Sequence, residues 1–268
     1  MRTWRFLNTG ASTAPLNMAI DEAILAAHAN DKCLPTLRIY QWSPPAMSLG
    51  YFQRSHGIDL AECRRLGIDV IRRSTGGKAV LHFGDLTYSV VAGITDGMPS
   101  SVIAAYRLIC EGLLVAFRAL GFEAELRGQD AKSARSDICF LASTAGDIVY
   151  EGRKFVGSAQ TWHGSSMLQH GSITLEPHLE VWVSLQGDRR ALSPDFEETL
   201  RREMTSIKDI LGHIPSPDEI AAAIRSGMSR ALGVEIVNGE LRSEELAQAD
   251  EIAGQHAEES SPLITSAK

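Results

Sequence analysis

Residues 147–175, DIVYEGRKFVGSAQTWHGSSMLQHGSITL, decide the fold class. Three runs rich in β-forming residues, 147–150, 153–162 and 167–175, follow one another closely, and a Glu151-Gly152 turn joins the first two. Strands connected by such short turns pair antiparallel, because parallel strands need a long crossover between them. The stretch therefore predicts a largely antiparallel sheet and argues against a doubly wound parallel fold.

Helical and strand patterns surround this meander. Apolar residues at helical spacing predict long helices over 15–29 and 101–120. Shorter helices are expected at 59–66, 195–211 and 217–232, and strands at 37–42, 46–52, 69–71, 79–82 and 86–92. We interpret 37–42 and 46–52 as strands joined by a proline turn, and 79–82 and 86–92 as an antiparallel pair. The predicted class is α/β of the α+β type, with a mixed, largely antiparallel sheet packed with helices.

The length of 268 residues is consistent with one large domain, which we place at residues 1–250. The remaining residues, 251–268, are rich in Ser and Ala, and we expect a disordered tail there.

The composition excludes several classes of function. The chain has 26 Lys and Arg against 33 Asp and Glu, a net charge of −7, which argues against binding to nucleic acid. No apolar run reaches the roughly 20 residues that span a bilayer, and the N-terminus does not resemble a signal peptide, so we expect a cytoplasmic protein without a membrane partner. Four scattered cysteines and eight histidines show no zinc-binding spacing, so no metal is expected.

A loop with adjacent glycines is the first candidate site. In residues 72–78, RRSTGGK, two glycines allow the backbone to approach a ligand, and three cations and two hydroxyls flank them. Such a loop can hold an anion or a carbonyl group. It lacks the spacing of a nucleotide-binding phosphate loop, and a glycine hairpin with a solvated charged rim remains an equal alternative.

A strand with a lysine is the second candidate. Strict alternation in 153–162 predicts that Lys154, Val156, Ser158 and Gln160 share one face, and that Phe155, Gly157, Ala159 and Thr161 share the other. A lysine beside small residues suits a buried carbonyl or carboxyl site. The alternative is an edge strand with Lys154 in solvent.

A cysteine in an irregular segment is the third. Cys139 lies in 136–140, whereas Cys63 and Cys110 fall within predicted helices and Cys33 has no evident partner. A loop cysteine becomes reactive when a nearby cation lowers its pKa from the usual ~8.5. Lys154 or one of His82, His163 and His170 can supply that cation, and an unreactive cysteine is the alternative.

Taken together, these motifs resemble the lipoate-protein ligase and octanoyltransferase family. The resemblance rests on residues 72–82 (RRSTGGKAVLH), 86–90 (LTYSV), 152–160 (GRKFVGSAQ) and 168–173 (LQHGSI), supported by 17–23 (NMAIDEA) and 49–53 (LGYFQ). It covers about residues 3–235 in the right order. It implies the catalytic fold of the biotin and lipoyl protein ligases.

The cysteine decides which reaction the resemblance implies. The ATP-dependent ligases of this family need no thiol, whereas its octanoyltransferases form an acyl thioester on a loop cysteine, which Cys139 resembles by its position before Lys154. The implied reaction moves an octanoyl group from acyl carrier protein through Cys139 to a lysine of a lipoyl domain, without a cofactor. Lys154 is then expected to stabilise the thiolate or the oxyanion and to help deprotonate the incoming amine. The implied substrate-binding residues are Arg73, Ser74, Gly76, Gly77, His82, Gly157, Ser158, Ala159, His170 and Gly171.

The implied partners are proteins. They are acyl carrier protein as donor and, as acceptor, a lipoyl-domain protein such as the glycine cleavage H protein or the 2-oxoacid dehydrogenase E2. Both kinds are typically acidic in this family, so basic clusters such as Arg72-Arg73 with Lys78 are candidate contacts. Three alternatives stay open: an ATP-dependent and Mg-dependent lipoate ligase, an amidotransferase between lipoyl-domain proteins, and a noncatalytic acyl-binding protein.

Overall fold

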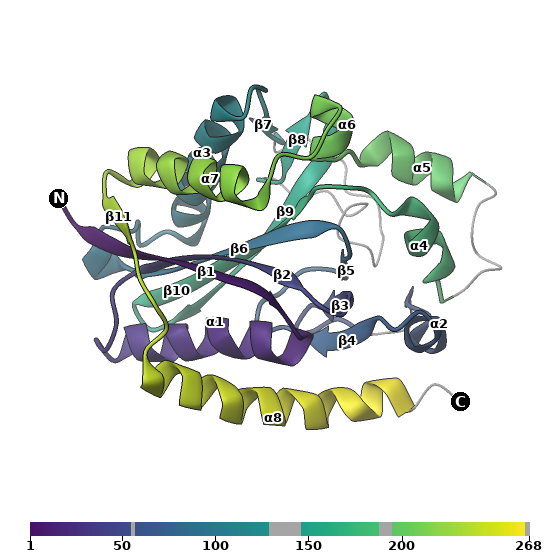
Figure 1. Ribbon diagram of the computed structural model, residues 1–268, viewed down its shortest axis with the longest axis horizontal. Coiled ribbons are helices and arrows are strands. Elements are labelled where there is room, and N and C mark those ends of the chain that lie inside the picture. Colours follow the sequence, from purple (N-terminus) through teal and green to yellow (C-terminus); the bar gives the residue numbers. More distant parts are fainter. Residues whose placement is uncertain (55–56, 129–145, 188–194, 266–268) are drawn as a thin grey trace.

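A computed structural model describes residues 1–54, 57–128, 146–187 and 195–265 (Figure 1). Two sheets form its centre. The large sheet has the strand order β11 (Glu235–Asn238), β1 (Thr3–Ser12), β2 (Thr36–Trp42), β6 (Asp85–Gly93), β10 (Ser166–Thr174), β9 (Arg153–His163), β8 (Ile148–Tyr150), β7 (Glu125–Leu126). The small sheet has the order β4 (Asp69–Arg72), β3 (Ala46–Leu49), β5 (Val80–His82).

The large sheet is mostly antiparallel. Only β1 pairs in parallel, with β11 on one side and β2 on the other, while every pair from β2 to β7 is antiparallel. The consecutive strands β8, β9 and β10 form the meander that the sequence predicts. The predicted class is therefore confirmed.

Helices cover both faces of this sheet. On one face lie α3 (Val102–Ala119) and α7 (Pro217–Leu232), and on the other lies α1 (Ala14–Ala29), with α8 (Ser243–Thr265) outside it (Figure 1). The α3 and α7 backbones touch, because a Cβ on Gly227 would lie only 2.3 Å from the Gly112 carbonyl oxygen. The largest core cluster lies beneath α3 and includes Tyr88, Phe117 and Phe155.

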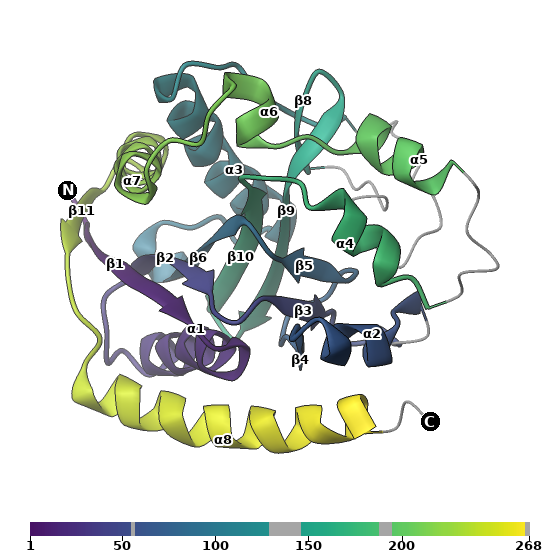
Figure 2. The ribbon, with the colours of Figure 1, turned by 45° about the vertical axis from the view of Figure 1, so that its right-hand side comes forward.

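Shorter helices surround the small sheet. They are α2 (Leu60–Arg65), α4 (Leu179–Ser184) and α5 (Phe196–Glu203) (Figure 2). The helix α6 (Ile207–Leu211) lies nearer to α3, and a 3₁₀ turn, η2 (Ile94–Asp96), follows β6. A second core cluster joins α2, α4 and α5 to the small sheet through Leu60, Trp182 and Leu200. In the part of the chain that the structure describes, no helix is both long and apolar enough to cross a membrane.

The predicted pairing of 79–82 with 86–92 is wrong, whereas β2 and β3 are two strands joined by the proline turn that the sequence predicts. The strands β2 and β3 do not form a hairpin, and neither do β5 and β6, because each pair is divided between the two sheets. Both edges of β2 are already occupied by β1 and β6, and both edges of β6 by β2 and β10. The small-sheet strands β3 and β5 pair with each other instead. The connections from β2 to β3 and from β5 to β6 therefore pass from one sheet to the other and bring the small sheet against the large one.

Three further differences concern the helices and the N-terminus. The predicted helix 195–211 is interrupted at Thr205, whose backbone N–H donates to the Lys154 carbonyl oxygen (3.0 Å) and so joins the large sheet. The N-terminal strand β1, the edge strand β11 and the short helix α4 were not predicted. The six residues of α4 and the four of β11 are too short a run to show a clear period, and polar residues interrupt β1.

The predicted disorder of 251–268 is wrong as far as Thr265, because α8 continues to that residue. Ile252 and Ala253 pack against the cluster beneath α1, and His256 Nε2 lies 3.1 Å from Glu22 Oε2 of that helix. Composition alone does not reveal this helix, because packing against α1, and not its own helix propensity, stabilises it. Residues 266–268 lie outside the described residues.

Candidate active site

A pocket lies between the two sheets. Its cavity has a volume of about 40 Å³ and is partly open to solvent. The strands β2, β6, β9 and β10 form its floor, Met18 of α1 closes one side, and the small sheet with the loop after β4 forms the opposite wall. Its lining consists of Met18, Tyr40, Trp42, Ser48, Arg73, Gly77, Val80, His82, Thr87, Gly157, Ser158, Ala159, His170, Gly171 and Ser172.

Two glycines allow close packing in the floor and in the wall of this pocket. A Cβ on Gly171 would lie 2.4 Å from Ser158 Oγ and 2.7 Å from Tyr88 Cε1. In the wall, a Cβ on Gly50 would lie 2.1 Å from the carbonyl oxygen of Gly77, which itself has φ +97°. Both contacts are closer than a Cβ atom allows, so glycine at these positions lets β10 pack on Ser158 and Tyr88 within the large sheet and lets Gly50 pack on Gly77 within the wall.

Arg73 holds the double-glycine loop in place. Its Nη2 donates to the carbonyl oxygens of Gly76 and Lys78, both at 2.8 Å, and its Nη1 donates to the Ser48 carbonyl oxygen at 2.9 Å. The side chain is buried, with 5% exposed. The loop is therefore an ordered pocket wall, and Arg73 organises it through backbone carbonyl groups. The alternative of a solvated charged rim is wrong for this residue.

A buried carboxylate network lies beneath α1 at one end of the pocket. Asp21 Oδ1 accepts from Arg38 Nη1 and Ser89 Oγ, both at 2.7 Å, while its Oδ2 accepts from Tyr40 Oη at 2.9 Å. Burial by itself raises the pKa of Asp21, but the Arg38 guanidinium and the hydrogen bond from His170 outweigh it, so the pKa lies below its usual value. Asp21 is therefore ionised.

His170 connects this network to the loop. Its Nδ1 lies 3.3 Å from Asp21 Oδ2, and its Nε2 lies 2.6 Å from Thr75 Oγ1. A carboxylate can only accept, so Nδ1 donates to Asp21, while Nε2 and the Thr75 hydroxyl share the second hydrogen bond. The pocket wall is thus tied to the sheet through one histidine.

A second carboxylate, Asp85, accepts hydrogen bonds from three pocket residues. His82 Nδ1 lies 2.8 Å from Asp85 Oδ2, which also accepts from Ser172 Oγ at 2.7 Å and from Thr87 Oγ1 at 3.2 Å. Burial lowers the pKa of His82 although Asp85 opposes this, so the imidazole is neutral at pH 7. Its Nε2 then accepts from the Ser48 hydroxyl, at 2.8 Å.

The polar lining is thus satisfied by its own members. The Trp42 ring stacks on the His82 ring, with centroids 3.9 Å apart, and its Nε1 donates to Thr87 Oγ1 at 2.8 Å. Because these donors and acceptors are paired with one another, aromatic rings, methyl groups and glycine backbone are left to contact a ligand. Such a surface suits an apolar chain.

Lys154 is buried, so the alternative of a solvated edge lysine is wrong. Its Nζ lies 3.0 Å from Asp147 Oδ1, and the exposed fractions of the two side chains are 0% and 1%. The ladder between β8 and β9 pairs Ile148 with Val156 and Val149 with Lys154, which leaves Phe155 as an extra bulged residue.

The bulge corrects the predicted alternation. Phe155 and Val156 both belong to the core cluster beneath α3, so Lys154 and Val156 do not share a face. Lys154 instead lies on the same side of β9 as Gly157 and Ala159, which line the pocket. At 3.3 Å per residue, the Cα atoms of Lys154 and Gly157 are about 10 Å apart. The ion pair therefore lies beyond one end of the pocket on the same face of the sheet.

The described cysteines are unreactive thiols. Burial raises the pKa of Cys33, Cys63 and Cys110 to about 12 in each case. Cys139 lies outside the described residues. The residues on either side of that segment are held together, because the Arg127 N–H donates to the Asp147 carbonyl oxygen at 2.8 Å and the Gly146 N–H to the Arg127 carbonyl oxygen at 3.4 Å.

Eight of the ten substrate-binding residues expected from the sequence lie together in the pocket lining, and Ser74 and Gly76 do not. Ser158 lines the pocket, but its hydroxyl lies 2.8 Å from Tyr88 Oη in the core. Sequence reasoning missed Met18, Tyr40, Trp42, Ser48, Val80, Thr87 and Ser172. Of these, Thr87 and Ser172 are cross-strand partners in the β6–β10 register, a signal that requires the strand pairing to be known. Among the described residues, no cluster of His, Cys, Asp and Glu could hold a metal ion.

Comparison with curated proteins finds relatives that match this chain over more than nine-tenths of both lengths. The chain is 38% identical to Octanoyltransferase LipM of Kyrpidia tusciae over 265 residues, which cover 96% of this chain and 97% of that one. It is 39% identical to Octanoyltransferase LipM of Symbiobacterium thermophilum, covering 92% of each chain, and 36% identical to that of Staphylococcus aureus, covering 93% and 94%.

Solved structures show the same fold at lower identity. A lipoate-protein ligase A bound with ATP superposes with a TM-score of 0.77 at 24% identity, covering 95% of both chains. The bi-partite lipoate protein ligase of Thermoplasma acidophilum, solved with its E2 lipoyl domain, gives a TM-score of 0.78 at 22% identity, covering 95% and 93%. The ligase-like fold expected from the sequence is therefore confirmed. Residues 13–229 match the family described as Lipoyl protein ligase A/B catalytic domain, and the chain therefore belongs to that family.

Proposed function

We propose that this protein is an octanoyltransferase of protein lipoylation that takes its acyl group from acyl carrier protein and gives it to a lysine of a lipoyl domain. The observation that carries the proposal is an apolar pocket whose floor runs along β9 toward the buried pair of Lys154 and Asp147. Relatives named octanoyltransferases, 36–39% identical over more than nine-tenths of both chains, support the same reaction.

The pocket is suited to the acyl chain. Its polar side chains are engaged with Asp21, Asp85 and one another, so an unbranched alkyl chain costs them no hydrogen bond. A free carboxylate or a sugar would instead need open donors. We assign chain binding to Gly77, Gly157, Ala159, His170 and the other pocket residues predicted from the sequence, and we assign Ser74 and Gly76 no contact.

Cys139 is our candidate nucleophile, because it resembles the loop cysteine of the octanoyltransferases by its position before Lys154, whereas burial raises the pKa of Cys33, Cys63 and Cys110 to about 12. In the first half-reaction, its sulfur forms a bond to the octanoyl carbonyl carbon as the bond to the pantetheine sulfur breaks. The Cys139 proton leaves with the released pantetheine thiol. In the second, the lysine nitrogen of the lipoyl domain forms a bond to the octanoyl carbonyl carbon as the bond to the Cys139 sulfur breaks, and Cys139 recovers a proton from that amine.

Lys154 is proposed to stabilise the negative charge that develops in both half-reactions. Because the buried Asp147 carboxylate fixes the Lys154 ammonium in place, its positive charge can stabilise the developing negative charge without moving during the reaction. Thioester to amide transfer is downhill, so no ATP, Mg²⁺ or other cofactor is required. The described cysteines are free thiols, which fits a reducing compartment such as the cytoplasm, where we place the enzyme.

The test is intact-mass analysis of the protein after mixing with octanoyl-acyl carrier protein in the absence of ATP. We expect an octanoyl adduct on the wild type and on the control variant Cys33→Ala, and none on Cys139→Ala. Addition of a lipoyl domain should then remove the adduct from the enzyme and place it on the domain.

Two other outcomes contradict the proposal. Absence of an adduct on folded wild type, together with pyrophosphate release from ATP and free lipoate, would identify a ligase. Acylation by an octanoylated lipoyl domain, but not by the carrier protein, would identify an amidotransferase.

A further inference from the structure

Two exposed aromatic residues stand beside the pocket wall. Tyr51 is 54% exposed and Phe52 is 89% exposed, and their rings meet edge to face with centroids 4.7 Å apart. An aromatic side chain left in water forgoes a large burial gain. Exposed aromatic residues are also the side chains that most often dominate protein interfaces. This pair therefore differs from a single exposed Leu or Ile, which needs no explanation.

The backbone beneath the pair is held firmly. Arg72 Nη1 donates to the carbonyl oxygens of Gly50 at 2.7 Å, Tyr51 at 3.2 Å and Gln53 at 2.7 Å. The Tyr51 N–H in turn donates to the Thr75 carbonyl oxygen at 2.9 Å. One guanidinium thus fixes the turn, so little backbone entropy is lost when a partner binds.

The same contacts tie the pair to the pocket. Thr75 hydrogen-bonds His170 of the pocket floor, and Gly50 packs directly on Gly77, which lines the pocket. The aromatic pair thus belongs to the solvent side of the loop whose other side forms the pocket wall. A protein that binds to this aromatic pair would therefore lie beside the pocket into which its attached acyl chain must enter.

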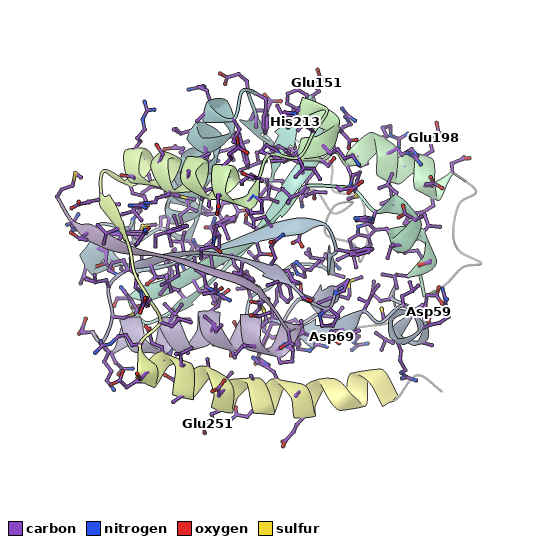
Figure 3. All side chains as sticks on the ribbon, in the orientation of Figure 1. Asp59, Asp69, Glu151, Glu198, His213 and Glu251 are labelled. Carbon is purple, nitrogen blue, oxygen red and sulfur yellow. The ribbon has the colours of Figure 1, made fainter. Side chains whose placement is uncertain are left out.

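The surroundings are positively charged although the whole chain is not. Residues 50–58 contain one Lys or Arg and residues 72–84 contain three, and neither stretch contains Asp or Glu, in a chain with net charge −7. Arg54 is exposed, and its guanidinium has no hydrogen bond or ion pair to any residue that the structure describes. The first carboxylate after 50–58 is Asp59, which caps α2 by accepting from the Glu62 N–H at 2.9 Å (Figure 3).

We propose that Tyr51, Phe52 and Arg54, here called the aromatic rim, dock the carrier protein that donates the octanoyl thioester. The inference rests on the proposed function. The donor carries its acyl chain on an arm with a phosphodiester, which a cationic rim attracts. The acceptor offers a lysine, whose ammonium group the same rim repels. Both proteins are expected to be acidic, so the group next to the reacting atom decides: the phosphodiester of the donor arm is attracted and the ammonium of the acceptor lysine is repelled, which favours the donor for this surface.

The test compares three octanoyl thioesters as donors in the first half-reaction: octanoyl-acyl carrier protein, octanoyl-4′-phosphopantetheine and octanoyl-N-acetylcysteamine. The variants are Phe52→Ala and Arg54→Ala, with Leu246→Ala as a matched control because Leu246 is also exposed, at 45%, but lies on α8. We expect Phe52→Ala to lower kcat/KM for the carrier protein about tenfold or more, in the range of an interface hot spot.

The other two donors separate the contacts. Phe52→Ala should leave both small thioesters unaffected, because they lack the protein surface. Arg54→Ala should lower kcat/KM for the carrier protein at low salt, and the loss should become smaller as ionic strength rises. Leu246→Ala should match the wild type with every donor.

Four outcomes would overturn the inference. Unchanged rates with the carrier protein in both variants would exclude docking at the rim, and equal losses with all three donors would mean a distorted pocket. A loss confined to transfer onto the lipoyl domain would assign the rim to the acceptor. If no donor acylates the wild type, the proposed function itself fails and the inference falls with it, whereas the first three outcomes leave that function intact.

Discussion

The Nζ of Lys154 lies 3.0 Å from Asp147 Oδ1, and neither side chain is exposed to solvent. The bulge at Phe155 is what turns the lysine away from the core cluster beneath α3 and toward the face of the sheet that forms the pocket floor. Asp147 directly precedes β8, and its carbonyl oxygen accepts from the Arg127 N–H. The ion pair therefore couples the edge of the sheet to the proposed site of acyl transfer.

Replacing Asp147 by Asn should impair both stability and transfer. The change leaves a buried ammonium without its carboxylate, and breaking a buried ion pair from one side costs about 3 to 5 kcal/mol. We expect a lower urea midpoint and a lower rate of octanoyl adduct formation. Chemical denaturation and intact-mass kinetics on the same preparation measure the two effects.

A double-mutant cycle separates these effects. If Asp147 acts on the reaction through Lys154, then Asp147→Asn should slow a Lys154→Met variant no further, and Asp147→Glu should recover part of the wild-type rate. Independent, additive losses in rate would show that Asp147 has a different role.

Gly171→Ala tests the pocket floor. The new methyl group would meet Ser158 Oγ at 2.4 Å and Tyr88 Cε1 at 2.7 Å, so β10 or β9 must shift. We expect a raised KM for octanoyl donors of every kind and a lower melting temperature. The matched control is Gly76→Ala, where an added Cβ meets no atom within 4 Å. A Gly76→Ala variant as impaired as Gly171→Ala would contradict the assignment of Gly171 to the floor and of Gly76 outside it.

The sequence predicts the part of this architecture that depends on local pattern. The β8–β10 meander, helices α1, α3 and α7 and the α+β class all follow from periodicity and turn residues. The division into two sheets does not follow, because two adjacent strands such as β5 and β6 look like a hairpin until the competing partners of β6, which are β2 and β10, are known. Likewise, α8 has weak local signals, and the interactions with α1 that hold it arise only in the folded chain.

The candidate site divides in the same way. The motifs brought together eight of the expected pocket residues, since they lie on strands β5, β9 and β10 or in the loop before β5. The sequence did not predict the hydrogen-bond partners of those residues. Asp21 and Asp85 come from α1 and β6, and their hydrogen bonds to His170 and His82 depend on how the helix and the two sheets pack. Alternation also failed at Lys154, because a bulge at Phe155 has no clear signature in the sequence.

Asp21 should make stability depend on pH in the acid range. Its folded-state pKa lies below the ordinary value of 3.8, since Arg38 and His170 outweigh the effect of burial. A depressed folded-state pKa means that its stabilising contribution is complete above about pH 4 and is lost as pH falls through the folded-state value. Urea midpoints at pH 7 and at pH 3 should therefore differ less in Asp21→Asn than in wild type. The variant should also be less stable at pH 7, and an unchanged pH dependence would exclude Asp21 as a source of it.

The last helix should contribute measurably to the stability of the domain, in contrast to a disordered tail. Glu245 of α8 accepts from Arg5 of β1 through both carboxylate oxygens, each at 2.7 Å, and both side chains are buried. Truncation after residue 242 would remove the carboxylate that pairs with the buried Arg5 guanidinium and uncover the apolar face that α1 presents to Ala249 and Ile252. We expect a lower melting temperature and a lower urea midpoint. Truncation after residue 258, which keeps these contacts, is the matched control and should retain most of the wild-type stability. Equal stability of all three chains would mean that α8 does not hold the domain together.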